Sequence, residues 1–205
     1  MRIRITFTKQ GALRYTGHLD LHKLWERAAR RAELPLAYSQ GFHPQPKMNM
    51  AAALPLGFSS RCEVMDMRLE HDIPLSDLAT RINATLPAGL QVVDVTQVDE
   101  RAPALQTQVA SAEYEVTLTE PVDGSALKRK IDSVMESESI SRARRGKTYD
   151  LRPLVETLSI LDNHKIFMRL AAREGATGRP EEVLDILGIA FEETRIERTR
   201  LIFQS

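Results

Sequence analysis

The stretch Tyr38-Ser-Gln-Gly-Phe-His-Pro-Gln-Pro-Lys47 carries the most unusual set of side chains in the sequence. Within ten residues it offers a hydroxyl, two amides, an imidazole, aromatic faces and an ammonium group, a set typical of recognition loops. Gly41, Pro44 and Pro46 disfavour regular structure here, so we expect a long loop. Two interpretations stay open: a contact loop for a ligand, or a structural loop with Phe42 packed into the core.

Basic residues are concentrated around this loop. Residues 1–50 contain nine Lys or Arg against three Asp or Glu, whereas residues 51–100 contain three against eight. Proteins hold single-stranded RNA with cations on phosphates and with aromatic or guanidinium planes on bases. We therefore predict a contact surface for single-stranded RNA. Its predicted members are Arg14, Tyr15, His18, Arg27, Arg30, Arg31, Tyr38, Gln40, Phe42, His43 and Lys47.

A second basic cluster follows much later in the chain. Arg144, Arg145 and Lys147 are further candidates for phosphate contacts, and the alternative is a set of solvated charges that protect a strand edge. Gly146-Lys147-Thr148 is similar to the end of a phosphate-binding P-loop, but the first glycine of that motif is missing. The sequence therefore does not predict nucleotide hydrolysis.

His18 and His22 are spaced by one helical turn, and Glu26 follows one turn later. Two histidines at this spacing can bind zinc with a carboxylate as third ligand. The pattern is not the metalloprotease motif H-E-x-x-H, because Leu19 stands where the general base belongs. We favour the alternative to a zinc site, in which one histidine lies at the start of the helix and the other is exposed. We expect neither a bound metal nor a cofactor. If the protein were an enzyme, His18 or His43 would be its candidate general base.

The composition is that of an ordinary globular protein. Of 205 residues, 42% are hydrophobic and 27% charged, and the formal net charge is zero. This composition differs from the low hydrophobicity and high net charge of a disordered chain. No apolar run approaches the roughly 18–20 residues that span a bilayer, and the start lacks the apolar segment of a signal peptide. The single cysteine, Cys62, excludes an internal disulfide. We expect a cytoplasmic protein without membrane contact.

The elements that must position these residues repeat one order, β-α-β-β-α-β, twice. Residues 2–8 alternate polar and apolar like a half-buried strand, and apolar residues recur at helical spacing from 18 to 32. The remaining elements expected in the first unit are strands 48–54, 62–69 and 91–98 and a helix over 74–83. Those of the second are strands 112–119, 140–151, 157–162, 165–172 and 193–203 and helices 124–136 and 179–187.

This order predicts the fold class and the domain organisation. Strand–helix–strand repeated with short connections is the split β-α-β arrangement of a ferredoxin-like fold. We expect an α+β protein of two tandem ferredoxin-like domains with antiparallel sheets. The predicted domains are 1–100, with the basic helix and the loop, and 111–205, joined by a linker over 101–110.

Several segments also resemble a known family, the radical-SAM-associated domain of unknown function. The resemblance rests on Gly17-His-Leu-Asp-Leu21, Glu26-Arg27, Arg30-Arg31-Ala32, Leu34-Pro35-Leu36 through Met48, and Leu54-Pro-Leu-Gly57 with Glu63. In that family the domain is a separate protein or is fused behind a cobalamin-binding radical-SAM domain. Its genes often lie beside those of an E/G-type ribonuclease and of large-subunit ribosomal proteins. The resemblance thus implies a radical-SAM partner and an RNA or ribosome-related context.

The chain cannot itself be the radical-SAM catalyst, because it lacks the CxxxCxxC motif and has one cysteine. The leading hypothesis is a non-catalytic accessory protein of a radical-SAM enzyme. It would bind RNA or present a substrate through the basic helix and the loop 38–47. One alternative is a module that docks only to protein. The other is an RNA-processing enzyme with a histidine as general base.

Overall fold

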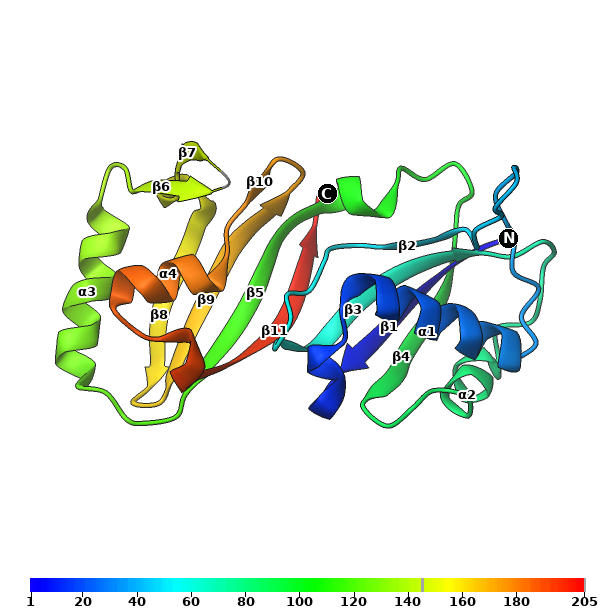
Figure 1. The fold of residues 1–205 in the computed structure, drawn as a ribbon, viewed down its shortest axis with the longest axis horizontal. Helices are drawn as coiled ribbons and strands as arrows, with labels where there is room; N and C mark the ends of the chain where they lie inside the picture. The colour runs from blue at the N-terminus through cyan, green and yellow to red at the C-terminus, as the bar shows by residue number, and fades with distance from the viewer. Residues whose placement is uncertain (145, 205) are drawn as a thin grey trace. The chain divides into compact units, whose positions relative to one another are not determined.

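The computed structural model describes residues 1–144 and 146–204. The chain divides into two compact units, Met1–Gln108 and Val109–Ser205 (Figure 1). No helix among the described residues is long and apolar enough to cross a membrane. Each unit contains an antiparallel sheet and two α-helices, and each is described by itself below.

Unit 1 forms one sheet with the strand order β4-β1-β3-β2, in which every neighbouring pair is antiparallel. Ile5 lies opposite Met65 on one side and Val95 on the other, so β1 is the central strand. The elements are β1 (Arg2–Lys9), the 3-10 helix η1 (Gly11–Tyr15), α1 (His18–Arg31), β2 (Met48–Met50), β3 (Ser59–Arg68), α2 (Leu78–Asn83), β4 (Leu90–Val98) and the 3-10 helix η2 (Leu105–Gln108).

Unit 2 repeats this pairing, with the order β8-β9-β5-β11 and an extra short strand β10 that also pairs with β9. A separate hairpin, β6-β7, is inserted between α3 and β8. The elements are β5 (Val109–Leu118), α3 (Gly124–Glu136), β6 (Ser141–Arg144), β7 (Lys147–Asp150), η3 (Arg152–Leu154), β8 (Val155–Asp162), β9 (Lys165–Arg173), β10 (Ala176–Thr177), α4 (Pro180–Leu187), η4 (Phe191–Glu193) and β11 (Thr194–Phe203).

The predicted α+β class with antiparallel sheets is confirmed, and both units have the strand pairing of a split β-α-β arrangement. Two expected elements differ in extent. The strand expected over 48–54 stops at Met50, and the helix expected over 74–83 begins at Leu78. The strands expected around 140–151 form the β6-β7 hairpin. Residues 101–110, predicted as a linker, contain η2 and the first two residues of β5.

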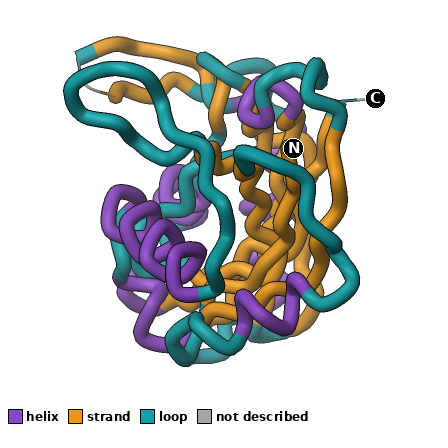
Figure 2. Tube along the Cα trace, turned by 90° about the vertical axis from the view of Figure 1, so that its right-hand side faces the viewer, coloured by secondary structure: helices purple, strands orange, loops and turns teal. Residues whose placement is uncertain are grey.

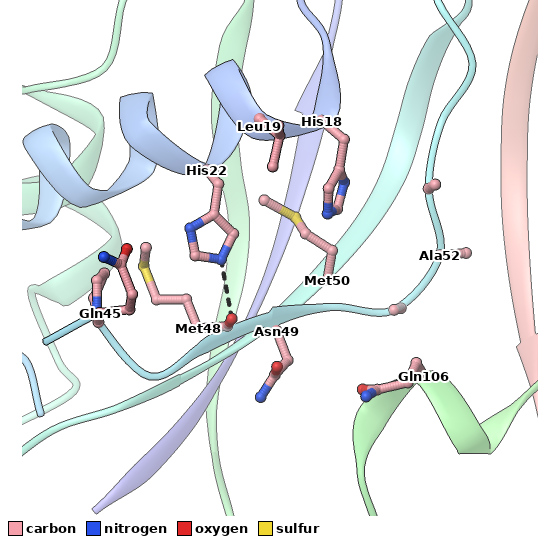
Figure 3. A pocket seen from close by; sticks show the side chains of 12 residues that line it. His18, Leu19, His22, Gln45, Met48, Asn49, Met50, Ala52 and Gln106 are labelled. Carbon is pink, nitrogen blue, oxygen red and sulfur yellow. Dashed lines mark hydrogen bonds between the residues drawn. The ribbon is translucent and has the colours of Figure 1, made fainter. Parts of the chain in front are cut away.

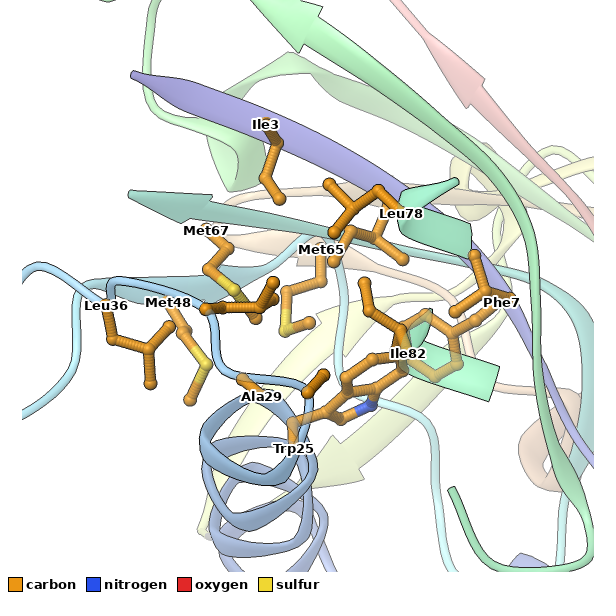
Figure 4. Close-up of a cluster of buried hydrophobic side chains, with 14 of the residues drawn as sticks. Ile3, Phe7, Trp25, Ala29, Leu36, Met48, Met65, Met67, Leu78 and Ile82 are labelled. Atoms are coloured by element: carbon orange, nitrogen blue, oxygen red, sulfur yellow. The ribbon is translucent and has the colours of Figure 1, made fainter. Parts of the chain in front are cut away.

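The core of unit 1 lies between its sheet and α1. Figure 1 shows α1 running along one face of the strands, and Figure 2 shows helices, in purple, beside the strands, in orange. Its buried face includes Leu21, Trp25 and Ala29, and Trp25 packs edge-on against Phe7 of β1 with ring centroids 4.7 Å apart (Figure 4). Burying one such large side chain contributes roughly 1.5–3 kcal/mol. This packing fixes which residues of α1 face solvent.

A buried ion pair connects the strands of unit 1 to the segment before η2. Arg2 Nη2 lies 2.6 Å from Asp66 Oδ2, and Arg4 Nε lies 2.8 Å from Asp66 Oδ1. Arg2 also donates to the carbonyls of Ala102 and Pro103. The Asp66 carboxylate therefore joins β1 to β3. Arg2, one of the two arginines that it binds, also holds the chain just before Gln106.

Candidate nucleic-acid interface

The loop between α1 and β2 is closed at its base and exposed at its tip. The Ser39 N–H donates to the Gln45 carbonyl at 2.8 Å, and the Gln45 N–H donates to the Ser39 hydroxyl at 3.0 Å. Tyr38 and Pro46 form an isolated bridge just below. These contacts hold residues 40–44 as a protruding turn in which every residue is exposed.

Phe42 stands at this tip and is fully exposed. The interpretation in which Phe42 packs into the core is therefore wrong. His43 and Gln40 beside it are also exposed, whereas Tyr38 is half-buried and packs against the core of unit 1. Tyr38 thus packs the base of the loop against the core, and Phe42 is presented to solvent at its tip.

The last turns of α1 contact the base of this loop. Arg30 Nε donates to the Tyr38 hydroxyl at 3.0 Å, and Arg30 Nη2 lies 2.7 Å from Glu26 Oε1. The hydrogen bond to Tyr38, and then the charge of Glu26, raise the pKa of Arg30 above its ordinary value. Its side chain is still 61% exposed, so the guanidinium can also contact a ligand.

Two more arginines lie on the other flank of α1. Arg27 and Arg31, one turn apart, line a hollow of about 250 Å³ together with Leu24, Thr85 and Pro87. Arg27 Nε donates to a carbonyl within the helix at 3.2 Å. In the described part of the chain no carboxylate lies within ion-pair distance of either guanidinium. Both charges therefore face solvent without an internal counter-charge.

A larger groove, of about 630 Å³, lies beside the N-terminal half of α1 (Figure 3). His18 and His22 lie along the helix with ring centroids 6.5 Å apart, and His22 Nε2 is 3.0 Å from the Met48 carbonyl oxygen. The opposite side is formed by the chain from the end of the loop through β2. The lining residues are His18, Leu19, His22, Gln45, Pro46, Met48, Asn49, Met50, Ala51, Ala52, Ala53 and Gln106.

Two residues of the stripe His18, His22 and Glu26 have structural partners. His22 contacts a backbone carbonyl and Glu26 pairs with Arg30. Among the described residues, no three His, Cys, Asp or Glu side chains are grouped so that they could hold a metal ion.

Arg14 and Tyr15 contact each other in η1. Arg14 Nη2 donates to the Tyr15 hydroxyl at 2.7 Å, and its guanidinium lies over the Tyr15 ring at 4.7 Å. Tyr15 is 64% exposed. The pair lies just before the start of α1. It offers an aromatic face and a cation on the same exposed surface.

The second basic cluster is held by acidic residues of α4. Arg142 Nη2 lies 2.5 Å from Asp185 Oδ2, and Arg144 Nη2 lies 2.5 Å from Glu182 Oε2. Burial lowers the pKa of Arg144, but Glu182 and Tyr149 more than offset this and the pKa is raised. These ion pairs fasten the β6-β7 hairpin to α4, which favours a structural role for Arg144.

The other two candidates of this cluster differ from Arg144. Lys147, at the start of β7, is exposed. Arg145 lies outside the described residues.

Sequence comparison assigns the chain to a family. The model of a family described as uncharacterized proteins conserved in bacteria, DUF2344, matches residues 2–180. The chain belongs to this family. No curated protein matches the chain.

Solved structures include chains similar to this DUF2344 chain. A chain in the crystal structure of a Cbf5–Nop10–Gar1 complex shares 10% identity at a TM-score of 0.49, over 97% of this chain and 48% of that one. A chain of the archaeal box H/ACA sRNP Nop10–Cbf5 complex shares 16% at 0.44, over 97% and 47%. The DUF2344 chain spans about half the length of these chains.

Several residues of the groove were not predicted as site members. Gln45 lies inside the predicted loop, and Asn49 and Met50 lie in the following strand. Gln106 comes from η2, more than fifty residues later. Only tertiary contacts bring these side chains together, so spacing along the sequence gives no signal for them.

Proposed function

We propose that this DUF2344 protein is a non-catalytic accessory protein that binds RNA, with α1 and the loop 38–47 as its contact surface. The observation that carries the proposal is the position of Phe42, fully exposed at the tip of a loop whose base is closed by hydrogen bonds. An aromatic ring held out in this way can stack on an unpaired base without first reorganising the loop.

Cations around the loop support the proposal. Arg30 is joined to the loop base through Tyr38, and Arg27, Arg31 and Lys47 are exposed on the same helix and loop. Guanidinium and ammonium groups on phosphates supply most of the sequence-independent affinity for nucleic acids. An exposed aromatic ring on a loop together with exposed arginines on the neighbouring helix is the arrangement expected for single-stranded RNA.

The resemblance to the radical-SAM-associated domain adds a partner to the proposal. With one cysteine, the chain lacks the ligands of an iron–sulfur cluster of its own, so a radical-SAM enzyme would supply the chemistry. In this proposal the present protein brings RNA to that enzyme. The alternative of an enzyme using His18 or His43 has no comparable support, because no described carboxylate pairs with either imidazole.

The test is a titration of the purified protein against a fluorescent single-stranded RNA and a hairpin RNA, at about 50 mM and about 200 mM salt. We expect the single strand to bind more tightly and its affinity to fall at the higher salt, because bound cations release counterions. Absent binding, or binding that does not respond to salt, would contradict the proposal.

A co-purification experiment distinguishes RNA binding from simple protein docking. The radical-SAM partner is isolated with the wild-type protein and with Arg30→Glu/Arg31→Glu, before and after nuclease treatment. If α1 contacts RNA, the double variant loses bound RNA while retaining the partner enzyme. Loss of the partner with no RNA present in either sample would instead make α1 a protein-docking surface.

A further inference from the structure

The groove beside α1 differs in chemistry from the cationic surface around it. Its lining residues include two imidazoles, three amides and two thioethers, and no lysine, arginine, aspartate or glutamate among the described residues lines it. A phosphate or a carboxylate would need a cation there to offset its desolvation. The lining therefore favours an uncharged group with polar edges.

The size and the lining of the groove suit a flat ring. Met48 is buried and Met50 is half-buried on the strand side, and methionine sulfurs make favourable contacts with aromatic rings. His18 and His22 face these residues from α1 (Figure 3). At about 630 Å³ the groove lies within the roughly 300–1,000 Å³ of small-molecule sites, enough for a base with its ribose.

Three amides line the groove: Gln45 at the end of the loop, and Asn49 and Gln106 on the other side of β2 from the imidazoles (Figure 3). Gln45, Asn49 and Gln106 each offer one acceptor and two donors. An Asn or Gln amide pairs bidentately with N6 and N7 of adenine, whereas guanine is contacted by Arg or Lys and cytosine by Asp or Glu. Because the lining offers amides and no charged side chain among the described residues, it fits adenine better than guanine or cytosine.

We infer that this groove binds an unpaired adenine of the RNA held by α1 and the loop. Gln45 belongs both to the loop base and to the groove wall, so a strand that stacks on Phe42 is placed to continue toward the groove. This inference rests on the proposed function and adds a base preference to it.

The first test uses free adenosine, which has no phosphate and therefore probes the groove apart from the cations. The readout is the set of imidazole proton NMR signals, assigned with single histidine variants. Adenosine should shift the signals of His18 and His22 and leave that of His164, an exposed histidine of unit 2, unchanged. Guanosine should give smaller shifts. Equal shifts with both nucleosides, or none at His18 and His22, would overturn the inference.

The second test compares two short single-stranded RNAs, one with adenines and one of the same length with abasic sites in their place. The wild type should bind the adenine strand about tenfold more tightly, and Asn49→Leu should abolish most of that difference. Asn49 is exposed, so the substitution leaves the core intact. Gln97→Leu, an exposed amide on β4 outside the groove, is the control and should behave as wild type.

The outcomes separate the two levels of the account. If neither RNA binds, the proposed function fails and the inference fails with it. If both RNAs bind equally, or Asn49→Leu retains the preference of the wild type, the groove does not bind the base, while RNA binding by α1 and the loop stands.

Discussion

The guanidinium of Arg30 donates to the hydroxyl of Tyr38 at 3.0 Å, so the last turns of α1 and the base of the loop share a hydrogen bond. Tyr38 in turn forms a bridge with Pro46 on the returning side of the loop. At the other end, His22 contacts the Met48 carbonyl. The segment from Tyr38 to Met48 is therefore attached to α1 at two places, and helix and loop form one surface.

Replacing Arg30 tests whether this surface contacts phosphate. Arg30→Gln should weaken RNA binding several-fold and reduce the slope of log affinity against log salt by about one. The control is Lys128→Gln on α3, because Lys128 is an exposed cation in the same kind of i,i+4 ion pair, with Asp132. The measurement is the anisotropy titration at several salt concentrations. Equal slopes for the two variants would remove Arg30 from the interface.

Gly89 is expected to be irreplaceable in unit 1. Its φ is +96°, and a Cβ there would lie 2.6 Å from the Gln10 carbonyl oxygen, a backbone atom that cannot easily move. Gly175 in unit 2 has φ +75° but open space around it. Gly175→Ala should cost about 1–2 kcal/mol through its backbone conformation alone, and Gly89→Ala should cost more. Urea unfolding measures both, and a smaller cost at Gly89 would be inconsistent with this steric explanation.

The Asp66 carboxylate should be far more important for stability than an exposed one. The side chains of Asp66 and Arg2 are only 4% and 5% exposed, so Asp66→Ala leaves a buried guanidinium without its counter-charge, at a cost of about 3–5 kcal/mol. Asp132→Ala, which breaks the exposed pair with Lys128, should cost about 0.3–0.5 kcal/mol. Thermal or urea unfolding of the two variants decides, and similar costs would refute the difference.

Acid should destabilise unit 2 through Asp150. Its carboxylate accepts the Ile140 N–H at 2.8 Å and the Arg152 N–H at 3.0 Å, and the Ile140 bond first of all lowers its pKa. A pKa lowered by folding contributes stability that is present above the unfolded value, about 3.9, and is lost as pH falls through the folded one. Melting temperatures measured from pH 7 downward should fall more steeply for the wild type than for Asp150→Asn. Identical slopes would contradict this role.

Much of the fold could be predicted from periodicity. The alternation in Arg2–Thr8 and the apolar positions of α1 predict which side of each element is buried. The same sides are buried in the structure. The extent of the shortest elements was harder to predict. β2 has three residues where a strand over 48–54 was expected, and the two-residue β10 was not expected. Such strands form because a neighbouring strand pairs with them rather than through local preference.

The candidate site could be predicted only in part. A loop with an aromatic residue and two prolines suits either a packed or an exposed Phe42, because the sequence does not show what the ring would pack against. The ion pair of Arg144 with Glu182 joins residues 38 apart, and Gln106 reaches the groove from outside the basic segment. Each of these relationships depends on the tertiary structure.

The most direct test of the central claim is the affinity of Phe42→Ala for single-stranded RNA. A base stacked on an aromatic ring contributes about 1–3 kcal/mol, and Phe42 is fully exposed, so the variant should fold as stably as the wild type yet bind at least fivefold more weakly. Leu161→Ala, an exposed apolar residue of unit 2, is the control. Wild-type affinity in Phe42→Ala would show that the tip of the loop does not contact RNA.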